Sequence, residues 1–343
     1  MVLNMSSLTP KKLINALKTL GQLMTNLNHD FEIIVEIAQH HNAWFTPNEV
    51  KKSLLSLGKM LNENELERWF SSITMTKNPK KVGLILAGNI PMVGFHDVLC
   101  VLATGNIALI KMSSSDDKLL PAIINLLISL EPSAANYIQY IDRLKDFDAI
   151  IATGSNNSSR YFDYYFGKVP NIIRKNRNSI GILSGQETTA DIEALGHDIF
   201  DYFGLGCRNV SKIYVPKGYE MKNFFEPLEK YQPIINHFKY NNNYDYNKSI
   251  YLVNAVKHLD NGFLLVKEDH SFTSPLAVLF YEEYDSVTEI EQLIEKESEK
   301  IQCVISSLDL NAKKSKIAFG QGQYPKLWDY ADDVDTIVFL LKI

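Results

Sequence analysis

The sequence predicts an α/β protein with two α/β domains behind a helical N-terminal region, and three observations support this prediction. Residues 1–80 show apolar residues at helical spacing. From Lys81 to Leu183, short apolar strands alternate with helices, which is typical of a mainly parallel sheet covered on both faces. A second series of strands and helices follows Gly204. We therefore expect a helical region at 1–80, α/β domains at 81–203 and 204–313, and a segment at 314–343 that returns to the core.

The composition places limits on the class of protein. With 343 residues, 45% apolar and 22% charged, the chain is typical of a soluble globular protein with a large core. Its net charge of −5 gives no reason to expect nucleic acid or an anionic membrane as a partner. The apolar run Leu119 to Leu130 contains Pro121 and Asn125 and is too short to span a bilayer. No secretion signal is recognisable, so we expect a cytoplasmic protein, and no metal site is indicated.

Two motifs predict where N-terminal helices begin. Thr9-Pro10 and Thr46-Pro47 each pair an N-cap residue with proline at the first helical position. Apolar residues at helical spacing follow both motifs. Nothing in this region indicates chemistry, so we expect a lid or a packing layer.

The first α/β domain is predicted to place polar residues where its strands end. Its strands are expected at Val82–Ala87, Ile107–Met112, Tyr137–Ile141, Ala149–Ala152, Asn171–Arg174 and Ile180–Leu183, and its helices at Phe95–Ala103, Asp116–Leu130 and from Thr153-Gly154-Ser155 to Gly167. Gly88-Asn89, Lys111 and Gly154-Ser155 follow three of these strands. Ligands of open parallel sheets bind at such carboxyl ends, where helix N-termini offer N–H groups to phosphates. A G-x-G-x-x-G fingerprint is absent, so a standard Rossmann phosphate loop is not supported.

The second α/β domain is predicted from weaker signals. A helix is expected at Lys222–Lys230, a polar, tyrosine-rich loop at Tyr240–Asn247, and a hairpin turn at Asp260-Asn261-Gly262. Further strands are expected at Phe263–Val266, Ala277–Tyr281 and Gln302–Ile305, with a surface helix at Val287–Lys300.

Cys207 lies in a tight connection between a helix and a strand. The helix before it shows an apolar stripe of Ile192, Leu195, Ile199 and Phe203 and is expected to end at the pair Gly204 and Gly206. A strand ending at Pro216 follows. A thiol in this setting can be a thiolate nucleophile, favoured by the positive charge of Arg208 and by backbone N–H groups. The alternative is a small buried residue at a turn.

The other two cysteines are expected in the core. Cys100 lies on an apolar helix face, and Cys303 lies in an apolar strand. Three cysteines cannot form a disulfide framework, which fits a reducing compartment.

Three separated motifs resemble the aldehyde dehydrogenase superfamily. They are Gly88-Asn89-Ile90-Pro91 with Leu102-Ala103-Thr104-Gly105-Asn106 and Leu109-Ile110-Lys111, then Ile150-Ile151-Ala152-Thr153-Gly154-Ser155, and finally Gly204-Leu205-Gly206-Cys207. Within that superfamily, Gly94-Phe95-His96-Asp97 and the tail motifs Phe319-Gly320-Gln321 and Leu327-Trp328-Asp329-Tyr330-Ala331-Asp332 resemble the LuxC-type acyl-CoA reductases. The resemblance covers roughly residues 80 to 343 and implies an aldehyde-dehydrogenase-like fold, with a Rossmann-like cofactor domain and a catalytic domain.

The resemblance also implies roles for individual residues. Cys207 would attack a thioester carbonyl, and Asn89 would stabilise the oxyanion together with the Cys207 backbone N–H. Lys111 would hold the adenosine ribose, and Gly154 and Ser155 the pyrophosphate at a helix N-terminus. As alternatives, Asn89 could be a turn residue and Lys111 a solvated strand end.

His96 and Asp97 follow at the start of a helix. His96 is a candidate general acid for the leaving thiolate or the aldehyde oxygen, with packing as the alternative. Asp97 is expected to be a first-turn carboxylate stabilised by the helix dipole.

Two departures from the superfamily pattern bear on the reaction. Hydrolytic members carry a glutamate base where this chain has Arg174-Lys175-Asn176-Arg177, which could instead form a positive rim for coenzyme A phosphates. NAD-preferring members often carry a glutamate where this chain has Ser114. Without that carboxylate, Lys111, Ser113 and Ser114 have room for a 2′-phosphate, so we expect NADPH as the cofactor.

The resemblance therefore implies NADPH-dependent reduction of an acyl-CoA, expected to be a fatty acyl-CoA, to the aldehyde through an acyl-Cys207 thioester. The acyl donor would be acyl-CoA or an acyl-protein. Two rival functions are a coenzyme-A-acylating aldehyde dehydrogenase working in the oxidative direction and an inert acyl-binding partner protein. A homodimer and an acyl-synthetase partner both remain open.

Overall fold

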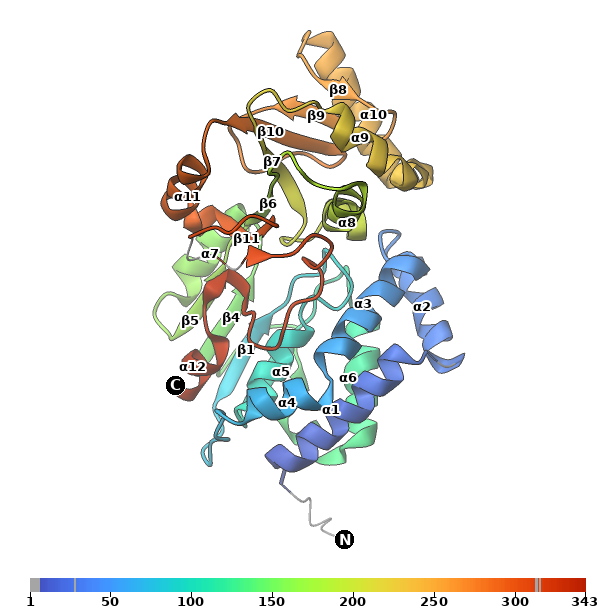
Figure 1. The fold of residues 1–343 in the computed structure, drawn as a ribbon. Coiled ribbons are helices and arrows are strands. Elements are labelled where there is room, and N and C mark those ends of the chain that lie inside the picture. Colours follow the sequence, from blue (N-terminus) through green and yellow to red (C-terminus); the bar gives the residue numbers. More distant parts are fainter. Residues whose placement is uncertain (1–6, 28, 312–313, 315) are drawn as a thin grey trace. The chain divides into compact units, whose positions relative to one another are not determined.

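The computed structural model describes residues 7–27, 29–311, 314 and 316–343. The chain forms two compact units, Met1–Asn176 with Tyr324–Ile343 and Arg177–Gln323, and each is described by itself (Figure 1). The sequence placed the change between the two α/β domains at residue 203. The units divide after Asn176 because the strand that begins at Asn178 pairs within the second sheet.

The first unit begins with helices that form a packing layer. They are α1 (Pro10–Thr25), α2 (His29–His41), α3 (Pro47–Met60) and α4 (Glu63–Phe70). Both predicted caps are confirmed, because the Thr9 hydroxyl accepts the Lys12 N–H and the Thr46 hydroxyl accepts the Glu49 N–H. Helices α1 and α2 pack against α6 (Leu119–Leu130).

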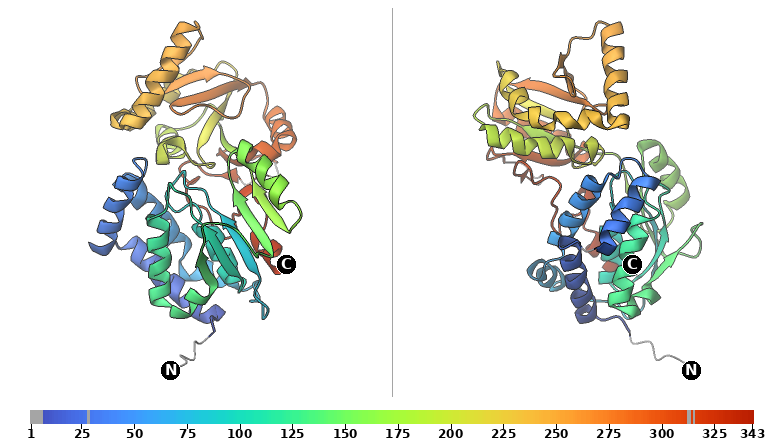
Figure 2. Two further views of the ribbon diagram at one scale, coloured as in Figure 1. Left: turned by 180° about the vertical axis from the view of Figure 1, so that it is seen from behind. Right: turned by 90° about the vertical axis from the view of Figure 1, so that its right-hand side faces the viewer.

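A five-stranded parallel sheet forms the centre of the first unit. Its strands are β1 (Lys81–Ile85), β2 (Ile107–Lys111), β3 (Ile138–Tyr140), β4 (Ala149–Thr153) and β5 (Asn171–Arg174), in the order β3-β2-β1-β4-β5. Right-handed crossovers put α5 (Phe95–Ala103) and α6 on one face and α7 (Asn156–Phe166) on the other (Figure 2). The strand order reverses between β1 and β4, where open sheets of this kind bind ligands.

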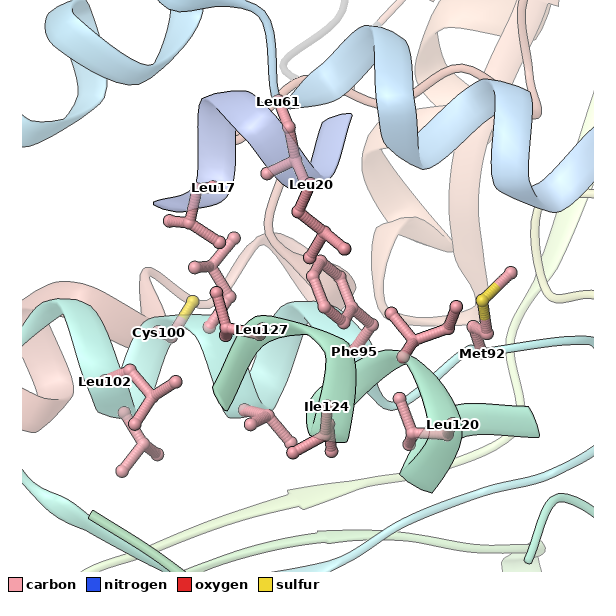
Figure 3. Close-up of a cluster of buried hydrophobic side chains, with 14 of the residues drawn as sticks. Leu17, Leu20, Leu61, Met92, Phe95, Cys100, Leu102, Leu120, Ile124 and Leu127 are labelled. Atoms are coloured by element: carbon pink, nitrogen blue, oxygen red, sulfur yellow. The ribbon is translucent and has the colours of Figure 1, made fainter. Parts of the chain in front are cut away.

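The core of the first unit lies between α5, α6 and the N-terminal helices. Leu17 and Leu20 of α1, Cys100 of α5 and Leu127 of α6 are at most 1% exposed and lie close together (Figure 3). Burial raises the pKa of the Cys100 thiol well above its usual value. The prediction that Cys100 is a core residue is confirmed.

The second unit is built on a seven-stranded sheet in the order β12-β11-β6-β7-β10-β9-β8. The strands are β6 (Asn178–Ile182), β7 (Val210–Pro216), β8 (Leu259–Asp260), β9 (Leu265–Glu268), β10 (Val278–Tyr284), β11 (Ile301–Ser306) and β12 (Lys316–Ile317). Among these described strands, the pair β8–β9 is antiparallel and the other pairs are parallel. The predicted hairpin turn is confirmed between β8 and β9, with Gly262 at φ 91°.

Helices cover both faces of the second sheet. On one face, α8 (Thr189–Phe200) and α9 (Lys222–Leu228) bury apolar residues that include Ile213 of β7. On the other face, α11 (Val287–Lys296) packs against residues that include Tyr214. Cys303 is 1% exposed in β11, as predicted.

Two sequence predictions for the second unit are wrong. Residues Tyr240–Asn247 belong to the helix α10 (Phe238–Val253) rather than to a loop, because Tyr240, Tyr244, Asn247 and Tyr251 form a buried stripe at helical spacing. The helix before Cys207 ends at Phe200, so Phe203 lies outside the helical stripe.

The overall α/β class with parallel sheets is as predicted. Within the described ranges, no helix is both long and apolar enough to cross a membrane.

Candidate functional site

The carboxyl end of the first sheet carries the predicted cofactor-binding residues. Lys111 and Ser114 are exposed, at the end of β2 and in the connection that follows it. Ser113 lies deeper, and its hydroxyl accepts the Ser115 N–H. Ser114 is therefore the more accessible hydroxyl beside Lys111.

Gly154 and Ser155 form the entry to α7. The Ser155 hydroxyl caps the helix by accepting the Ser158 N–H at 3.2 Å. A Cβ on Gly154 would lie 2.8 Å from the Phe162 ring and 2.9 Å from Ser158 Cβ, so glycine is needed for α7 to start this close to β4. Together with Lys111, this exposed helix N-terminus is a donor set suited to phosphate groups.

The loop with Asn89 connects β1 to α5 and is held at several points. A Cβ on buried Gly88 would lie 2.5 Å from Ser113 Oγ, so this backbone packs directly against the connection after β2. The Pro91 carbonyl accepts the Ser53 hydroxyl at 2.8 Å. Asn89 itself is exposed at the tip of the loop.

Asp116 also binds the loop that carries Asn89. Its carboxylate accepts the Met92 N–H at 2.8 Å and the Leu120 N–H at 3.1 Å, and its residue is 3% exposed. Burial raises the pKa of Asp116 to about 7, although the two N–H donors act in the opposite direction. The sequence placed Asp116 at the start of a helix but gave no sign that it binds the Asn89 loop.

Asp97 and Arg174 form a buried ion pair. Arg174 Nη1 donates to Asp97 Oδ2 at 2.6 Å, and Arg174 Nη2 donates to Thr336 Oγ1 at 3.3 Å. Burial opposes the charge on Arg174, but the Asp97 carboxylate more than offsets this, so the pKa of Arg174 lies above its usual value. Arg174 is 7% exposed, so the prediction of a positive rim at the surface is wrong for this residue.

The His96 ring lies among aromatic side chains. Its Nε2 donates to the Leu327 carbonyl at 2.9 Å, and its centroid lies 6.2 Å from that of Trp69 and 5.7 Å from that of Tyr330. The Tyr330 hydroxyl accepts Trp69 Nε1–H at 2.8 Å. These contacts favour the packing alternative for His96.

In the second unit, a left-handed turn precedes the candidate nucleophile. Tyr202, Phe203 and Gly204 have φ angles of 54°, 57° and 77°. Only glycine adopts this conformation readily; a side chain there costs about 1–2 kcal/mol per residue. Strain of this kind persists only where the surroundings enforce it, and it is concentrated at functional sites.

Cys207 is exposed at the end of this turn. Its backbone carbonyl accepts the Ser179 hydroxyl at 3.0 Å, and Ser179 Oγ lies 3.0 Å from the thiol of Cys303. Burial raises the pKa of Cys303 to about 11. Cys207 is thus the exposed thiol of the three cysteines, and the alternative that it is a buried turn residue is wrong.

Asn209 fills the space inside the turn. Its side-chain N–H groups donate to the carbonyls of Asp198 at 3.0 Å, Ile199 at 3.4 Å and Asp201 at 2.9 Å. Its Oδ1 accepts the Gly206 N–H at 2.8 Å. The sequence did not identify this residue, because a polar side chain after Cys207-Arg208 carries no signal of its contacts.

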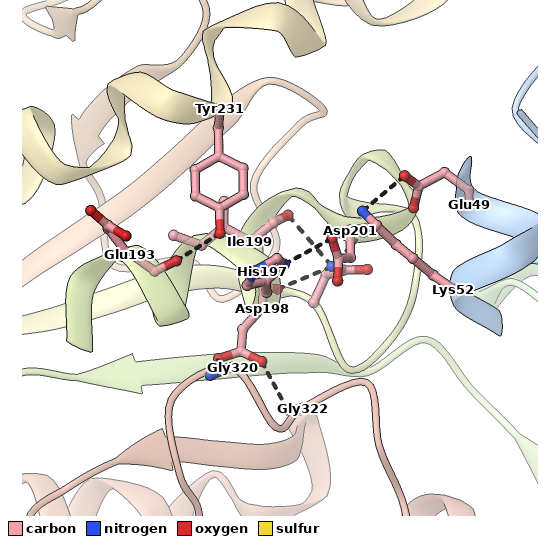
Figure 4. A network of polar contacts seen from close by, with 11 residues as sticks. Glu49, Lys52, Glu193, His197, Asp198, Ile199, Asp201, Tyr231, Gly320 and Gly322 are labelled. Carbon is pink, nitrogen blue, oxygen red and sulfur yellow. Dashed lines mark hydrogen bonds and ion pairs between the residues drawn. The ribbon is translucent and has the colours of Figure 1, made fainter. Parts of the chain in front are cut away.

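Asp198 joins α8 to the chain segment after β12. Its carboxylate accepts the Gly320 N–H at 2.6 Å and the Gly322 N–H at 2.8 Å (Figure 4). Burial raises the pKa of Asp198 to about 7. The tail motif around Gly320 is therefore tied to the helix that leads to Cys207.

The structure brings the predicted residues together in two groups. Gly88, Ser113 and the Asn89 loop meet at the carboxyl end of the first sheet, and Cys207 is presented by the second unit. Among the described residues, no cluster of three or more His, Cys, Asp or Glu residues could hold a metal ion.

A model of the family described as acyl-CoA reductase (LuxC) matches residues 10–236. No curated protein matches the chain.

Solved structures show the same fold at low sequence identity. Aldehyde dehydrogenase 21 from Physcomitrella patens, in complex with succinate, has a TM-score of 0.67 and 12% identity, over 98% of this chain and 85% of that one. An NADP-dependent enzyme from E. coli has a TM-score of 0.68 and 14% identity, over 93% and 79%. The NADP-dependent glyceraldehyde-3-phosphate dehydrogenase from Bacillus halodurans C-125, complexed with NADP, has a TM-score of 0.65 and 12% identity, over 91% and 78%. The predicted aldehyde-dehydrogenase-like fold is confirmed.

Proposed function

Because the chain belongs to the LuxC acyl-CoA reductase family, we propose that it reduces an acyl-CoA to the aldehyde through a thioester on Cys207. The enzyme class, an oxidoreductase acting on acyl-CoA, follows from the family. The observation that carries the finer proposal is the exposure of Cys207 on a strained turn, while Cys100 and Cys303 are buried.

The first step is acyl transfer. The Cys207 thiolate attacks the thioester carbonyl, a C–S bond forms, and the oxygen takes up negative charge. Asn89 and the Cys207 backbone N–H are proposed to donate hydrogen bonds to this oxyanion. When the carbonyl re-forms, the bond to the coenzyme A sulfur breaks and the coenzyme A thiolate leaves.

A bound nicotinamide cofactor would supply a hydride. Addition of that hydride to the carbonyl carbon of acyl-Cys207, followed by cleavage of the C–S bond, would give the aldehyde and regenerate the Cys207 thiolate. Hydrolytic relatives carry a glutamate base where this chain has the stretch Arg174-Lys175-Asn176-Arg177, and Arg174 in that stretch is paired with Asp97. No carboxylate of this stretch is therefore available to activate water against the thioester.

The residues at the carboxyl end of the first sheet fit a phosphorylated nucleotide. The exposed Lys111 cation, the Ser114 hydroxyl and the N-terminus of α7 provide donors and positive charge, and no carboxylate stands at position 114. We propose that this set prefers NADPH over NADH. Several structural relatives bind NADP or NAD, which supports a nicotinamide cofactor for this chain.

His96 is proposed to have a structural role. Its Nε2 proton is held by the Leu327 carbonyl, and the ring packs beside Trp69 and Tyr330. A proton held by that carbonyl is not positioned to protonate a leaving thiolate.

The test of the proposed function is the site of acylation. The protein is incubated with acyl-CoA without NADPH, and mass spectrometry should find one acyl group, on Cys207. Cys207→Ala should give no adduct and no aldehyde while it still binds NADPH. An adduct on another residue, or aldehyde formation by Cys207→Ala, would overturn the proposal.

A further inference from the structure

The peptide groups around Cys207 are fixed by two buried residues. On the N-terminal side, the carbonyl of the Gly206–Cys207 peptide accepts the backbone N–H of Asn209 at 3.0 Å, and the N–H of the preceding Leu205–Gly206 peptide donates to Asn209 Oδ1 at 2.8 Å. On the C-terminal side, the Cys207 carbonyl accepts the Ser179 hydroxyl at 3.0 Å. Asn209 is 3% exposed and Ser179 is fully buried.

Asn209 also holds the left-handed turn in place. Helix α8 ends at Phe200, and its last carbonyls have no partner within the helix. Asn209 donates to two of them, on Asp198 and Ile199, and to the Asp201 carbonyl just before the turn. One side chain thus joins the entrance of the strained turn to its exit at Gly206, which is what a strained conformation needs in order to persist.

Ser179 is itself oriented by Cys303. The Ser179 hydroxyl has a single proton, and it donates that proton to the Cys207 carbonyl. The contact of 3.0 Å with Cys303 Sγ must therefore use the thiol proton. Cys303 retains this proton at neutral pH because burial raises its pKa to about 11.

We propose that Asn209, Ser179 and Cys303 are positioning residues that fix the peptide groups around Cys207 for acyl transfer. This inference rests on the proposed function, because the Cys207 N–H is useful as an oxyanion donor only if its peptide group is held in one orientation. None of the three residues reacts; they act through the backbone of the turn.

The test uses variants that change these hydrogen bonds with little change in volume. Ser179→Ala removes the donor to the Cys207 carbonyl, and Asn209→Asp removes the donors to the α8 carbonyls. Cys303→Ala removes the thiol donor, whereas Cys303→Ser keeps a donor at the same place. The matched control is Ser306→Ala, because Ser306 is also a buried serine that donates to a backbone carbonyl, that of Ile182 at 2.9 Å.

The acylation rate of Cys207 is measured in a single turnover without cofactor. We expect Ser179→Ala and Asn209→Asp to lower it about ten- to hundredfold, the size of effect that a small misplacement of a reacting group produces. NADPH affinity should stay within about twofold, because the cofactor residues lie in the other unit. Cys303→Ser should retain more of the rate than Cys303→Ala, and Ser306→Ala should match the wild type. Equal rates in folded Ser179→Ala, Asn209→Asp and wild-type protein would overturn the proposal.

Hydrogen exchange separates this inference from the proposed function. Exchange of a peptide covering residues 200–210 needs no substrate and should be faster in Ser179→Ala and Asn209→Asp but not in Ser306→Ala. If the wild type is not acylated and exchange changes as expected, the proposed function fails and the fixed turn stands. If exchange in this peptide is unchanged, the positioning role is rejected whatever the activity.

Discussion

Arg174 Nη1 lies 2.6 Å from Asp97 Oδ2 in the interior of the first unit, so a buried ion pair joins the end of β5 to the first turn of α5. Asp97 Oδ1 and Arg174 Nε have no hydrogen-bond partner among the described residues. Each charge therefore depends on the other, since burial of an unpaired charge is unfavourable.

The first prediction follows from this pair. Asp97→Asn should destabilise the protein by about 3–5 kcal/mol, because it leaves the Arg174 charge buried without its counter-charge. The double variant, Asp97→Asn with Arg174→Met, should lose much less stability than the sum of the losses in the two single variants. Urea unfolding measures these differences. Glu63→Gln, which breaks the more exposed pair with Lys18, serves as the control and should change stability by less than about 1 kcal/mol. Additive losses in the double variant would contradict the coupling.

Asn89 is predicted to contribute to turnover but not to stability. Asn89→Ala should lower kcat by about two to three orders of magnitude, the effect of removing one oxyanion donor. Because Asn89 is exposed, the melting temperature of the Asn89→Ala variant should match that of the surface variant Asn78→Ala. Steady-state kinetics and thermal melts check both points. An unchanged kcat would return Asn89 to the role of a turn residue.

Cofactor preference is predicted to depend on position 114. A 2′-phosphate paired with Lys111 and nearby hydroxyls should gain about 1.5–3 kcal/mol from charge-assisted hydrogen bonds. This corresponds to roughly a ten- to hundredfold preference for NADPH over NADH. Ser114→Glu should reduce or reverse the preference, whereas Ser115→Glu adds the same charge one residue later and should alter it less. Equal kcat/KM for both cofactors in the wild type would reject the prediction.

Stability is predicted to fall as pH rises from about 4 to about 7. Burial raises the pKa of Asp116 to about 7 in the folded protein, while in the unfolded chain it stays near 3.9. Between these values the folded state binds the extra proton, so stability decreases with increasing pH. Asp116→Asn should remove about half of this dependence, because the pKa of buried Asp198 is also raised to about 7 and contributes the rest. Asp117→Asn, on the exposed neighbour, should leave the dependence unchanged. The pH dependence is measured as the difference between melting temperatures at pH 5 and pH 7.5. An equal difference in Asp116→Asn and Asp117→Asn would refute the assignment to Asp116.

The sequence predicted those parts of the fold that depend on local signals. The caps at Thr9 and Thr46 and the turn at Gly262 were correct because each depends on a few adjacent residues. The helix α10 was missed because its buried stripe consists of tyrosines and an asparagine among polar residues. Tyrosine can bury its ring at a helix face, so the spacing of Tyr240, Tyr244 and Tyr251 was the signal that could have identified the helix.

The candidate site was predictable only where it depends on short local motifs. Motif order indicated Cys207 and Asn89 as candidates, whereas the contacts that hold their loops join residues far apart in the sequence. Asp116 binds the Met92 N–H, and Ser179 binds the Cys207 carbonyl across 28 positions. A single sequence does not encode such pairings in a readable pattern, because each depends on how strands are ordered within the sheet.

The return of the last residues to the first unit has a consequence for synthesis on the ribosome. Asn106 Nδ2 donates to the Leu340 carbonyl at 3.3 Å, and α12 (Thr336–Leu341) packs against α5. The nascent chain has to make the whole of the second unit before it can deliver this helix. Until α12 is made, the apolar face of α5 that it covers stays exposed. A nascent chain stalled within the second unit would therefore expose apolar surface of the kind that chaperones bind. The first unit can therefore complete its contacts only after the chain of the second unit has been synthesised.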